Sequence, residues 1–87
     1  MEFEYDPAKS EANQSKHGIS FQEALSLWMD PKRVEFTARF QDEERFGLIA
    51  LLEGKLWTAI STTRNGKIRI ISVRSARDYE KKLYHQS

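Results

Sequence analysis

The segment from Arg45 to Arg74, RFGLIALLEGKLWTAISTTRNGKIRIISVR, decides the fold, because short turns divide it into three strand-like runs. The runs, rich in β-branched and aromatic residues, are 45–52, 55–63 and 67–74. Glu53-Gly54 separates the first two. Asn65-Gly66 separates the last two and is a strong hairpin signal, because both residues tolerate the positive φ of a type I′ turn. With a weaker strand at 33–38, the order predicts a four-stranded antiparallel sheet.

The sequence before this segment predicts a short strand and then a first helix. Residues 3–5 read as the strand. Asp6-Pro7 is a typical helix start, because Asp caps the N-terminus and Pro at the first position lacks only an N–H that would be unpaired anyway. We expect this polar helix to run to about Lys16, with Gly18 in the left-handed conformation past its end.

A second helix is predicted to follow almost at once. Ser20 and Glu23 have the spacing of a capping box. The apolar residues behind them recur at helical spacing and form one stripe, at Phe21, Ala24, Leu25 and Trp28. Asp30-Pro31 ends this pattern.

The chain ends in a third predicted helix. Ser75 and Asp78 suggest its N-terminal cap, and its apolar side carries Ala76, Tyr79 and Leu83. The fold class is therefore α+β, with a four-stranded antiparallel sheet plus a short N-terminal strand, two N-terminal helices and one C-terminal helix. Residues 1–87 form a single domain, as expected for this length.

The last strand bears on any site, because it is both apolar and basic. Strict alternation along 67–74 predicts that Ile68, Ile70, Ser72 and Arg74 point to one face. It places Lys67, Arg69, Ile71 and Val73 on the other face. An exposed concave face bearing Arg69, with Arg64 at the turn and Arg74 at the end of the strand, would then form a basic cleft.

Composition excludes several classes of protein. The chain has no cysteine, so disulfide frameworks and thiolate metal sites are excluded. No apolar run approaches the ~20 residues that span a bilayer, and no N-terminal signal sequence is visible. His17 and His85 have no partner at metal-ligand spacing. These features predict a cytoplasmic protein with no metal and no cofactor.

The charge is unevenly distributed, although the formal net charge is only +1. Residues 1–30 hold two basic and six acidic side chains, whereas residues 54–87 hold eight basic and two acidic ones. The stretch 62–77 contains five basic residues and no acid, at Arg64, Lys67, Arg69, Arg74 and Arg77. A localised basic segment in a near-neutral chain suggests an anion site, and a solvated strand face whose arginines pair with Glu43, Glu44 or Glu80 is the alternative.

These residue types suit RNA cleavage without a metal ion. RNA supplies its own nucleophile, the 2′-OH, so a catalyst has to stabilise the developing negative charge and transfer two protons. Arginines serve the first purpose, and His17, Lys16 or Tyr84 serve the second. His17 also ends a helix, where a cation is favoured for purely structural reasons. Aromatic side chains that remain available to stack on bases are Phe36, Phe40, Trp57 and Tyr84.

Three blocks of the sequence resemble the BrnT family of toxins. They are FEYDPAK at 3–9, Asn13 followed by KHGISFQEA at 16–24, and RIISVRSAR at 69–77 followed by Glu80 and Tyr84. The central EERF at 43–46 and Gly54 also fit. The resemblance covers essentially the whole chain, with a looser match from Pro31 to Gln41.

The resemblance implies a type II toxin–antitoxin component with a RelE-like ribonuclease fold. It also implies a BrnA-like antitoxin with a ribbon-helix-helix domain as partner, in a hetero-oligomer that we expect to be a heterotetramer. Operator DNA is then bound only through the antitoxin.

If the chain is such a ribonuclease, the residues singled out above are candidates for two roles, phosphate contact and catalysis. The phosphate-contacting candidates are Arg64, Lys67, Arg69, Arg74 and Arg77. The catalytic candidates are His17, Lys16, Arg64, Arg74 and Tyr84. Glu80 is expected to orient an arginine rather than to act as a base. The alternative function is a non-catalytic module that binds nucleic acid or only its antitoxin within a repressor complex.

Overall fold

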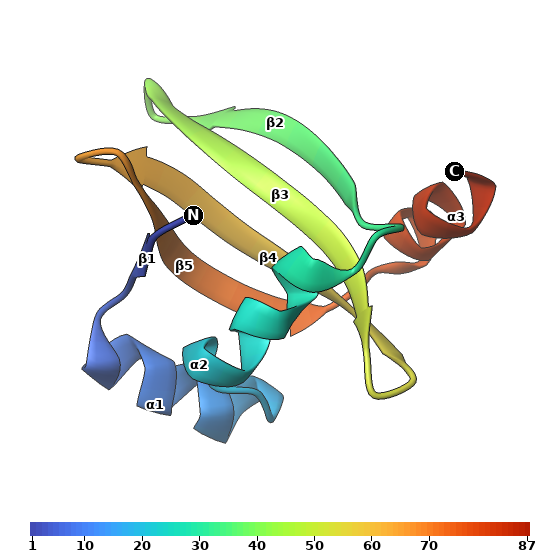
Figure 1. Cartoon of the computed structure of the whole chain (residues 1–87), viewed down its shortest axis with the longest axis horizontal. Coiled ribbons are helices and arrows are strands. Elements are labelled where there is room, and N and C mark those ends of the chain that lie inside the picture. Colours follow the sequence, from blue (N-terminus) through green and yellow to red (C-terminus); the bar gives the residue numbers. More distant parts are fainter.

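The computed structural model describes residues 1–87 and contains five strands, three α-helices and one 3₁₀-helix (Figure 1). The helical elements are α1 (Pro7–His17), α2 (Phe21–Ala24), the 3₁₀-helix η1 (Leu25–Met29) and α3 (Asp78–Gln86). The strands are β1 (Phe3–Glu4), β2 (Val34–Phe40), β3 (Glu43–Leu52), β4 (Lys55–Arg64) and β5 (Lys67–Ser75). The predicted α+β class and the order of elements are confirmed.

The sheet is five-stranded and mixed, with the strand order β1-β5-β4-β3-β2. The antiparallel pairing of β2, β3, β4 and β5 is confirmed. The prediction of a purely antiparallel sheet is incomplete, because β1 joins it in parallel, with Phe3 opposite Ile68. Nothing in the local sequence fixes that pairing, since the two strands are more than 60 residues apart. The turn at Asn65-Gly66 has positive φ at both residues, 53° and 76°, as a type I′ turn requires.

A β-bulge in β5 changes which side chains share a face. Ser72 pairs with Ile60 and Ile70 pairs with Ser61, so Ile71 has no partner on β4. One extra residue on one strand reverses the alternation beyond it. Ile70 and Val73, 1% and 0% exposed, therefore lie in the same core cluster. The assignment of residues to faces by strict alternation is therefore wrong beyond Ile71, and the bulge puts Arg74 on the same face as Arg69 and Arg64.

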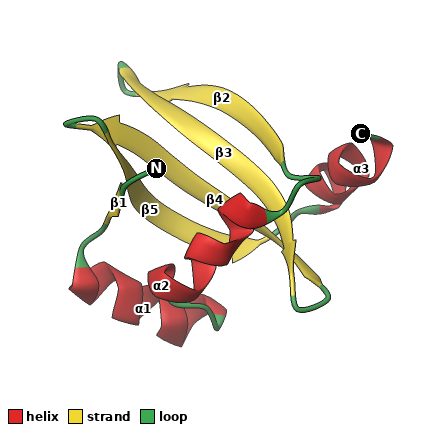
Figure 2. Ribbon diagram, viewed as in Figure 1, coloured by secondary structure: helices red, strands yellow, loops and turns green.

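The larger core cluster lies between one face of the sheet and the N-terminal helices. It joins Ile19, Phe21 and Trp28 to strand residues such as Leu48 and Trp57. Figure 2 shows α1 and α2 close together beside this face of the curved sheet, with α3 at another corner of the molecule. Trp57 is buried here, so it is not available to stack on a base.

Polar side chains, and not apolar ones, attach α1 to the rest of the fold. Its buried residues are Ser10 and Asn13. The Ser10 hydroxyl accepts a hydrogen bond from the Phe21 N–H at 2.9 Å. The Asn13 amide donates to the carbonyls of Ile19 and Val73, at 2.8 and 2.9 Å, and accepts the Val73 N–H at 3.1 Å. Asn13 thus takes the place of a neighbouring strand at this point on the free edge of β5.

The second predicted helix is α-helical for only one turn. The Ser20–Glu23 capping box is present, with bonds of 2.9 and 3.1 Å. The chain then tightens into η1, which brings Leu27 and Trp28 into the core. The predicted stripe is therefore partly wrong, because a 3₁₀-helix has three residues per turn and buries Leu27 in preference to Leu25.

The predicted cap and apolar side of the C-terminal helix are wrong. Ser75 still belongs to β5, where it pairs with Trp57, and Arg77 is the residue that precedes α3. Tyr79 and Leu83 are exposed, whereas Glu80 and Tyr84 are buried. The helix can turn the face with Glu80 and Tyr84 inward because Glu80 is paired with Arg74 and the Tyr84 hydroxyl donates to Asp30. Tyr84 packs with Ile49, Leu56 and Ala76 in a second, smaller core cluster on the other face of the sheet.

Candidate functional site

Five basic side chains lie on the face of the sheet that α1 and α2 do not cover. Residues opposite each other in a ladder share a face, as do alternate residues along a strand. The β4–β5 pairs concerned are Thr58–Arg74, Thr62–Arg69 and Arg64–Lys67. Arg45 reaches the same face from β3, because it is four residues from Ile49, which pairs with Thr58. We call this set, Arg45, Arg64, Lys67, Arg69 and Arg74, the basic face.

Arg74 is held by Glu80, as the sequence suggested. Its guanidinium donates two hydrogen bonds to the carboxylate, at 2.8 and 3.1 Å. The fully buried carboxylate also accepts the Thr58 hydroxyl at 2.9 Å and the Arg77 N–H at 2.8 Å. Burial would raise the pKa of Glu80, but the hydrogen bonds, led by the one from Arg74, outweigh it and lower the pKa to about 2. In turn, the carboxylate raises the pKa of Arg74.

The other arginines and Lys67 differ in how they are paired. Arg69 forms an ion pair with Glu4 of β1 at 2.7 Å, and both side chains are about a quarter exposed. Arg64, Lys67 and Arg77 take part in none of the ion pairs of the chain. The side chains of Arg64 and Arg77 are exposed. The predicted phosphate contacts thus include three cations with no internal partner and two that are positioned by carboxylates.

Arg45 belongs to the basic face, although the sequence analysis did not select it. Its guanidinium lies 4.7 Å from the centre of the Phe40 ring, and one terminal nitrogen is 3.5 Å from the Glu43 carboxylate. The Phe40 ring is half exposed. Alternation along β3 shows from the sequence that Arg45 and Ile49 share a face. Only the pairing of β3 with β4 shows that this is the face that carries the other cations.

His17 and Lys16 lie beside the edge of β5. They are at the C-terminal end of α1 and line a shallow hollow of about 250 Å³ with Ile71 and Ser72. Ser72 pairs with Ile60 and so points to the same side of the sheet as Arg74. Neither His17 nor Lys16 forms an ion pair, and none of the ion pairs of the basic face includes them.

Tyr84 packs against Ile49, on the same side of the sheet as the basic face, but its hydroxyl is bound to a carboxylate. Its hydroxyl donates to the Asp30 carboxylate at 2.7 Å, and Asp30 accepts two backbone N–H groups, from Leu51 and Lys32, at 2.9 Å each. The bond to Asp30, with burial, raises the pKa of Tyr84 to about 12. Burial opposes ionisation of Asp30, but its hydrogen bonds, first that from Leu51, lower its pKa overall. The phenol joins α3 to Asp30, the residue that follows η1.

Phe36, a third candidate for stacking on bases, is occupied within the sheet. Its ring lies over Gly47 on the adjacent strand β3, where a Cβ would collide with the ring. It packs partly against the second core cluster. Of the four aromatic candidates, only Phe40 is largely exposed.

Residues 5–80 match the family described as the ribonuclease toxin BrnT of type II toxin–antitoxin systems. The match spans most of the chain and includes the basic face, Asn13 and Glu80. No curated protein matches the chain. No group of three or more His, Asp or Glu side chains is arranged to hold a metal ion. None of the helices is long and apolar enough to cross a membrane.

Proposed function

The chain belongs to the BrnT family of type II toxin–antitoxin ribonuclease toxins, and we propose that it is a toxin that cleaves RNA on the basic face. The observation that carries this proposal is the grouping of Arg64, Lys67 and Arg69 with Arg74 on one face by the bulge at Ile71. Cleavage proceeds by attack of the 2′-OH on the adjacent phosphorus, with no metal ion and in a RelE-like manner.

In this proposal the cations stabilise the charge that develops on the phosphate. Fixed donors aimed at developing charge stabilise a transition state most when they need no rearrangement. The ion pair with Glu80 holds the Arg74 guanidinium in one orientation. Arg64 and Lys67 have no internal partner, so they are free to bind phosphate oxygens, and Arg77 contacts a neighbouring phosphate.

Cleavage by the 2′-OH also needs a general base and a general acid. We retain His17, Lys16 and Tyr84 as the candidates. His17 and Lys16 would have to act on RNA that crosses the edge of β5 beside Ser72. Tyr84 would have to release Asp30 first. The variants His17→Gln and Lys16→Ala test this, because loss of a general acid or base costs ~10²–10⁴-fold in rate.

We propose that the toxin is neutralised in the cytoplasm by a BrnA-like ribbon-helix-helix antitoxin, in a heterotetramer that binds operator DNA through the antitoxin. The alternative is a non-catalytic module that binds nucleic acid or the antitoxin within the repressor complex. One observation favours the alternative: the Tyr84 hydroxyl is bound to Asp30, and neither His17 nor Lys16 takes part in the ion pairs of the basic face.

The test is cleavage of RNA by antitoxin-free protein in EDTA, with the product ends identified. The variant Arg64→Ala/Lys67→Ala removes two unpaired cations of the basic face. Arg39→Ala is the matched control, because Arg39 is exposed, has no ion pair, and lies on the other face of the sheet opposite Glu44. Arg74→Ala is unsuitable, because it leaves the Glu80 carboxylate buried without its counter-charge.

We expect products with 2′,3′-cyclic phosphate ends from the wild type and from Arg39→Ala, and a loss of cleavage in the double variant. Cleavage that requires added metal would overturn the metal-independent mechanism. No cleavage of free RNA, no cleavage of ribosome-bound RNA and no growth arrest on induction would establish the binding module in its place.

A further inference from the structure

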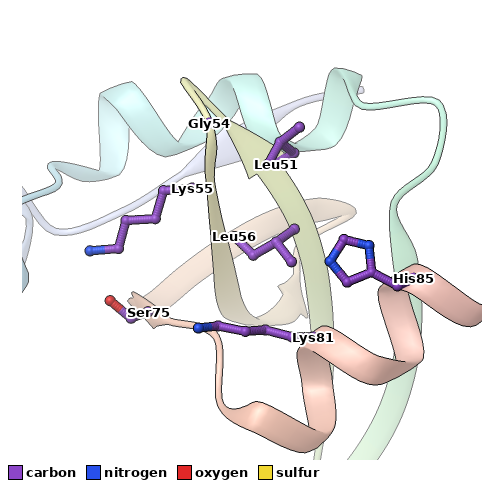
Figure 3. A pocket seen from close by; sticks show the side chains of 7 residues that line it. All are labelled: Leu51, Gly54, Lys55, Leu56, Ser75, Lys81 and His85. Atoms are coloured by element: carbon purple, nitrogen blue, oxygen red, sulfur yellow. The ribbon is translucent and has the colours of Figure 1, made fainter.

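A second basic region surrounds a hollow at the other end of β4. The hollow has a volume of about 380 Å³, within the range of small-molecule sites. Its lining residues come from the β3–β4 hairpin, the end of β5 and α3 (Figure 3), and they are Leu51, Gly54, Lys55, Leu56, Ser75, Lys81 and His85. This set was not predicted from the sequence, although the spacing of Lys81 and His85 places them on one side of a helix.

The hollow combines an apolar centre with polar groups on both sides. Figure 3 shows the ends of the Lys55, Ser75 and Lys81 side chains on one side of Leu56, and the imidazole of His85 on the other. No Asp or Glu lines the hollow. Neither lysine nor His85 takes part in an ion pair, and Lys55 is instead positioned over the Trp57 ring at 4.3 Å.

The hollow adjoins the basic face through two chain neighbours. Ser75 follows Arg74, whose guanidinium also donates to the Ser75 carbonyl at 3.3 Å. Lys81 follows Glu80, the partner of that guanidinium. The hollow therefore begins next to the Arg74–Glu80 pair, within reach of a strand whose phosphate is bound by Arg74.

We propose that the hollow is a subsite for one nucleotide of the RNA strand, next to the phosphate bound on the basic face. The base lies on Leu56 and Leu51, the phosphate on one side contacts Lys81 and Ser75, and the donor N–H of His85 faces the other side. Each nucleotide in a strand has one phosphate before it and one after it. This arrangement matches the hollow, where polar side chains lie on both sides of the apolar Leu56. The inference rests on the proposed function, because it takes RNA as the ligand.

The subsite contributes to affinity through Lys81, and its apolar floor gives it a means of selecting between bases. A phosphate contact carries no sequence information, whereas an apolar floor with a defined outline distinguishes bases by shape. The leucines at the floor lie next to the β3–β4 turn, where Glu53 and Gly54 both have positive φ and fix the edge of the hollow.

The experiment measures binding of a 2′-O-methyl RNA oligonucleotide by fluorescence anisotropy. This strand cannot be cleaved, so binding is measured whether or not the protein is a ribonuclease. The variants are Lys81→Ala and Lys81→Ala/His85→Ala. Lys82→Ala is the matched control, because it removes the same charge from the next, equally exposed position of α3, outside the hollow.

We expect Lys81→Ala to weaken binding about tenfold, as loss of a hydrogen bond to a charged group does. The slope of log K against log salt should fall by about 0.7, the value for one phosphate contact on a single strand. Lys82→Ala should leave both unchanged. Equal effects of Lys81→Ala and Lys82→Ala would overturn the proposal, because they would show only general attraction by the helix.

A second measurement tests for a nucleotide as opposed to a bare anion. Adenosine 5′-monophosphate and inorganic phosphate are titrated separately into ¹⁵N-labelled protein, and the amide shifts of Leu56, Lys81 and His85 are followed. We expect the nucleotide to bind more tightly than phosphate. Equal affinities would overturn the role of the apolar floor.

The outcomes separate this inference from the proposed function. If RNA cleavage fails while the oligonucleotide and nucleotide results hold, the ribonuclease is wrong and the subsite stands. If cleavage holds and Lys81→Ala binds RNA normally, the subsite is wrong. If these variants bind the antitoxin more weakly but bind RNA normally, the hollow belongs to the interface with the antitoxin, and the proposed nucleotide subsite is overturned.

Discussion

The Arg74 guanidinium and the Glu80 carboxylate form a two-point ion pair, with hydrogen bonds of 2.8 and 3.1 Å, and the carboxylate is fully buried. The same oxygen that accepts from Arg74 at the shorter distance also accepts from Thr58 and from the Arg77 backbone. The pair therefore joins β4, β5 and the start of α3. A residue selected from the sequence as a phosphate contact is also part of the structural framework.

Glu80→Gln should make the protein less stable at neutral pH by about 3 kcal/mol, because the charge of Arg74 loses its partner. The folded pKa of Glu80 is about 2, below the ordinary value of 4.5. A lowered folded pKa stabilises the protein above the unfolded pKa, and this stabilisation is lost as the pH falls towards 2. Urea unfolding at pH 7, 5 and 3 should show the wild type and variant converging in acid. A constant difference would contradict the assignment.

Tyr84→Phe should lower the stability by about 2 kcal/mol, as loss of a hydrogen bond to a charged group does. Its folded pKa of about 12 exceeds the ordinary 10, so the contribution is complete below pH 10 and lost between pH 10 and 12. An ultraviolet titration of tyrosinate should lose its most alkaline step in the variant. Tyr79→Phe, at an exposed position, is the control and should retain that step.

Asn13→Ala should cost about 2–3 kcal/mol in the free energy of unfolding, because it removes three hydrogen bonds and leaves buried backbone groups of Val73 and Ile19 unpaired. Hydrogen exchange should become faster at the Val73 amide. Gln14→Ala, at the exposed neighbouring position of α1, is the control. Equal stability of the two variants would refute the role of Asn13 at the edge of β5.

Gly47→Ala should destabilise the sheet by about 1–3 kcal/mol, because the new methyl group collides with the ring of Phe36. The double variant Gly47→Ala/Phe36→Leu tests the mechanism, since the smaller side chain frees that space. We expect the two changes together to cost less than the sum of the single ones. Additive costs, measured by thermal unfolding, would show that the ring is not the obstacle.

The basic segment could be located from the sequence, but the arrangement of its side chains could not. The run of five cations without an acid between residues 62 and 77 is a property of the chain alone. Whether Arg69 and Arg74 share a face depends on one unpaired residue, Ile71, and a bulge leaves no mark in an alternating pattern. The partners Glu4 and Asp30 lie 65 and 54 residues from the groups they bind.

The sequence by itself determined the order of the elements, the starts of α1 and α2 and the β4–β5 turn, because each of these signals acts within a few residues. Asp6-Pro7, Ser20 with Glu23, and Asn65-Gly66 bond to or shape their own backbone, and the structure has a cap or turn at each. Only the tertiary structure decided the parallel addition of β1, the face of α3 turned inward, and the bulge that puts Arg69 and Arg74 on one face. These features depend on contacts between segments that are distant in the sequence. Burial of the Glu80 carboxylate, for example, is favourable only when Arg74 lies beside it.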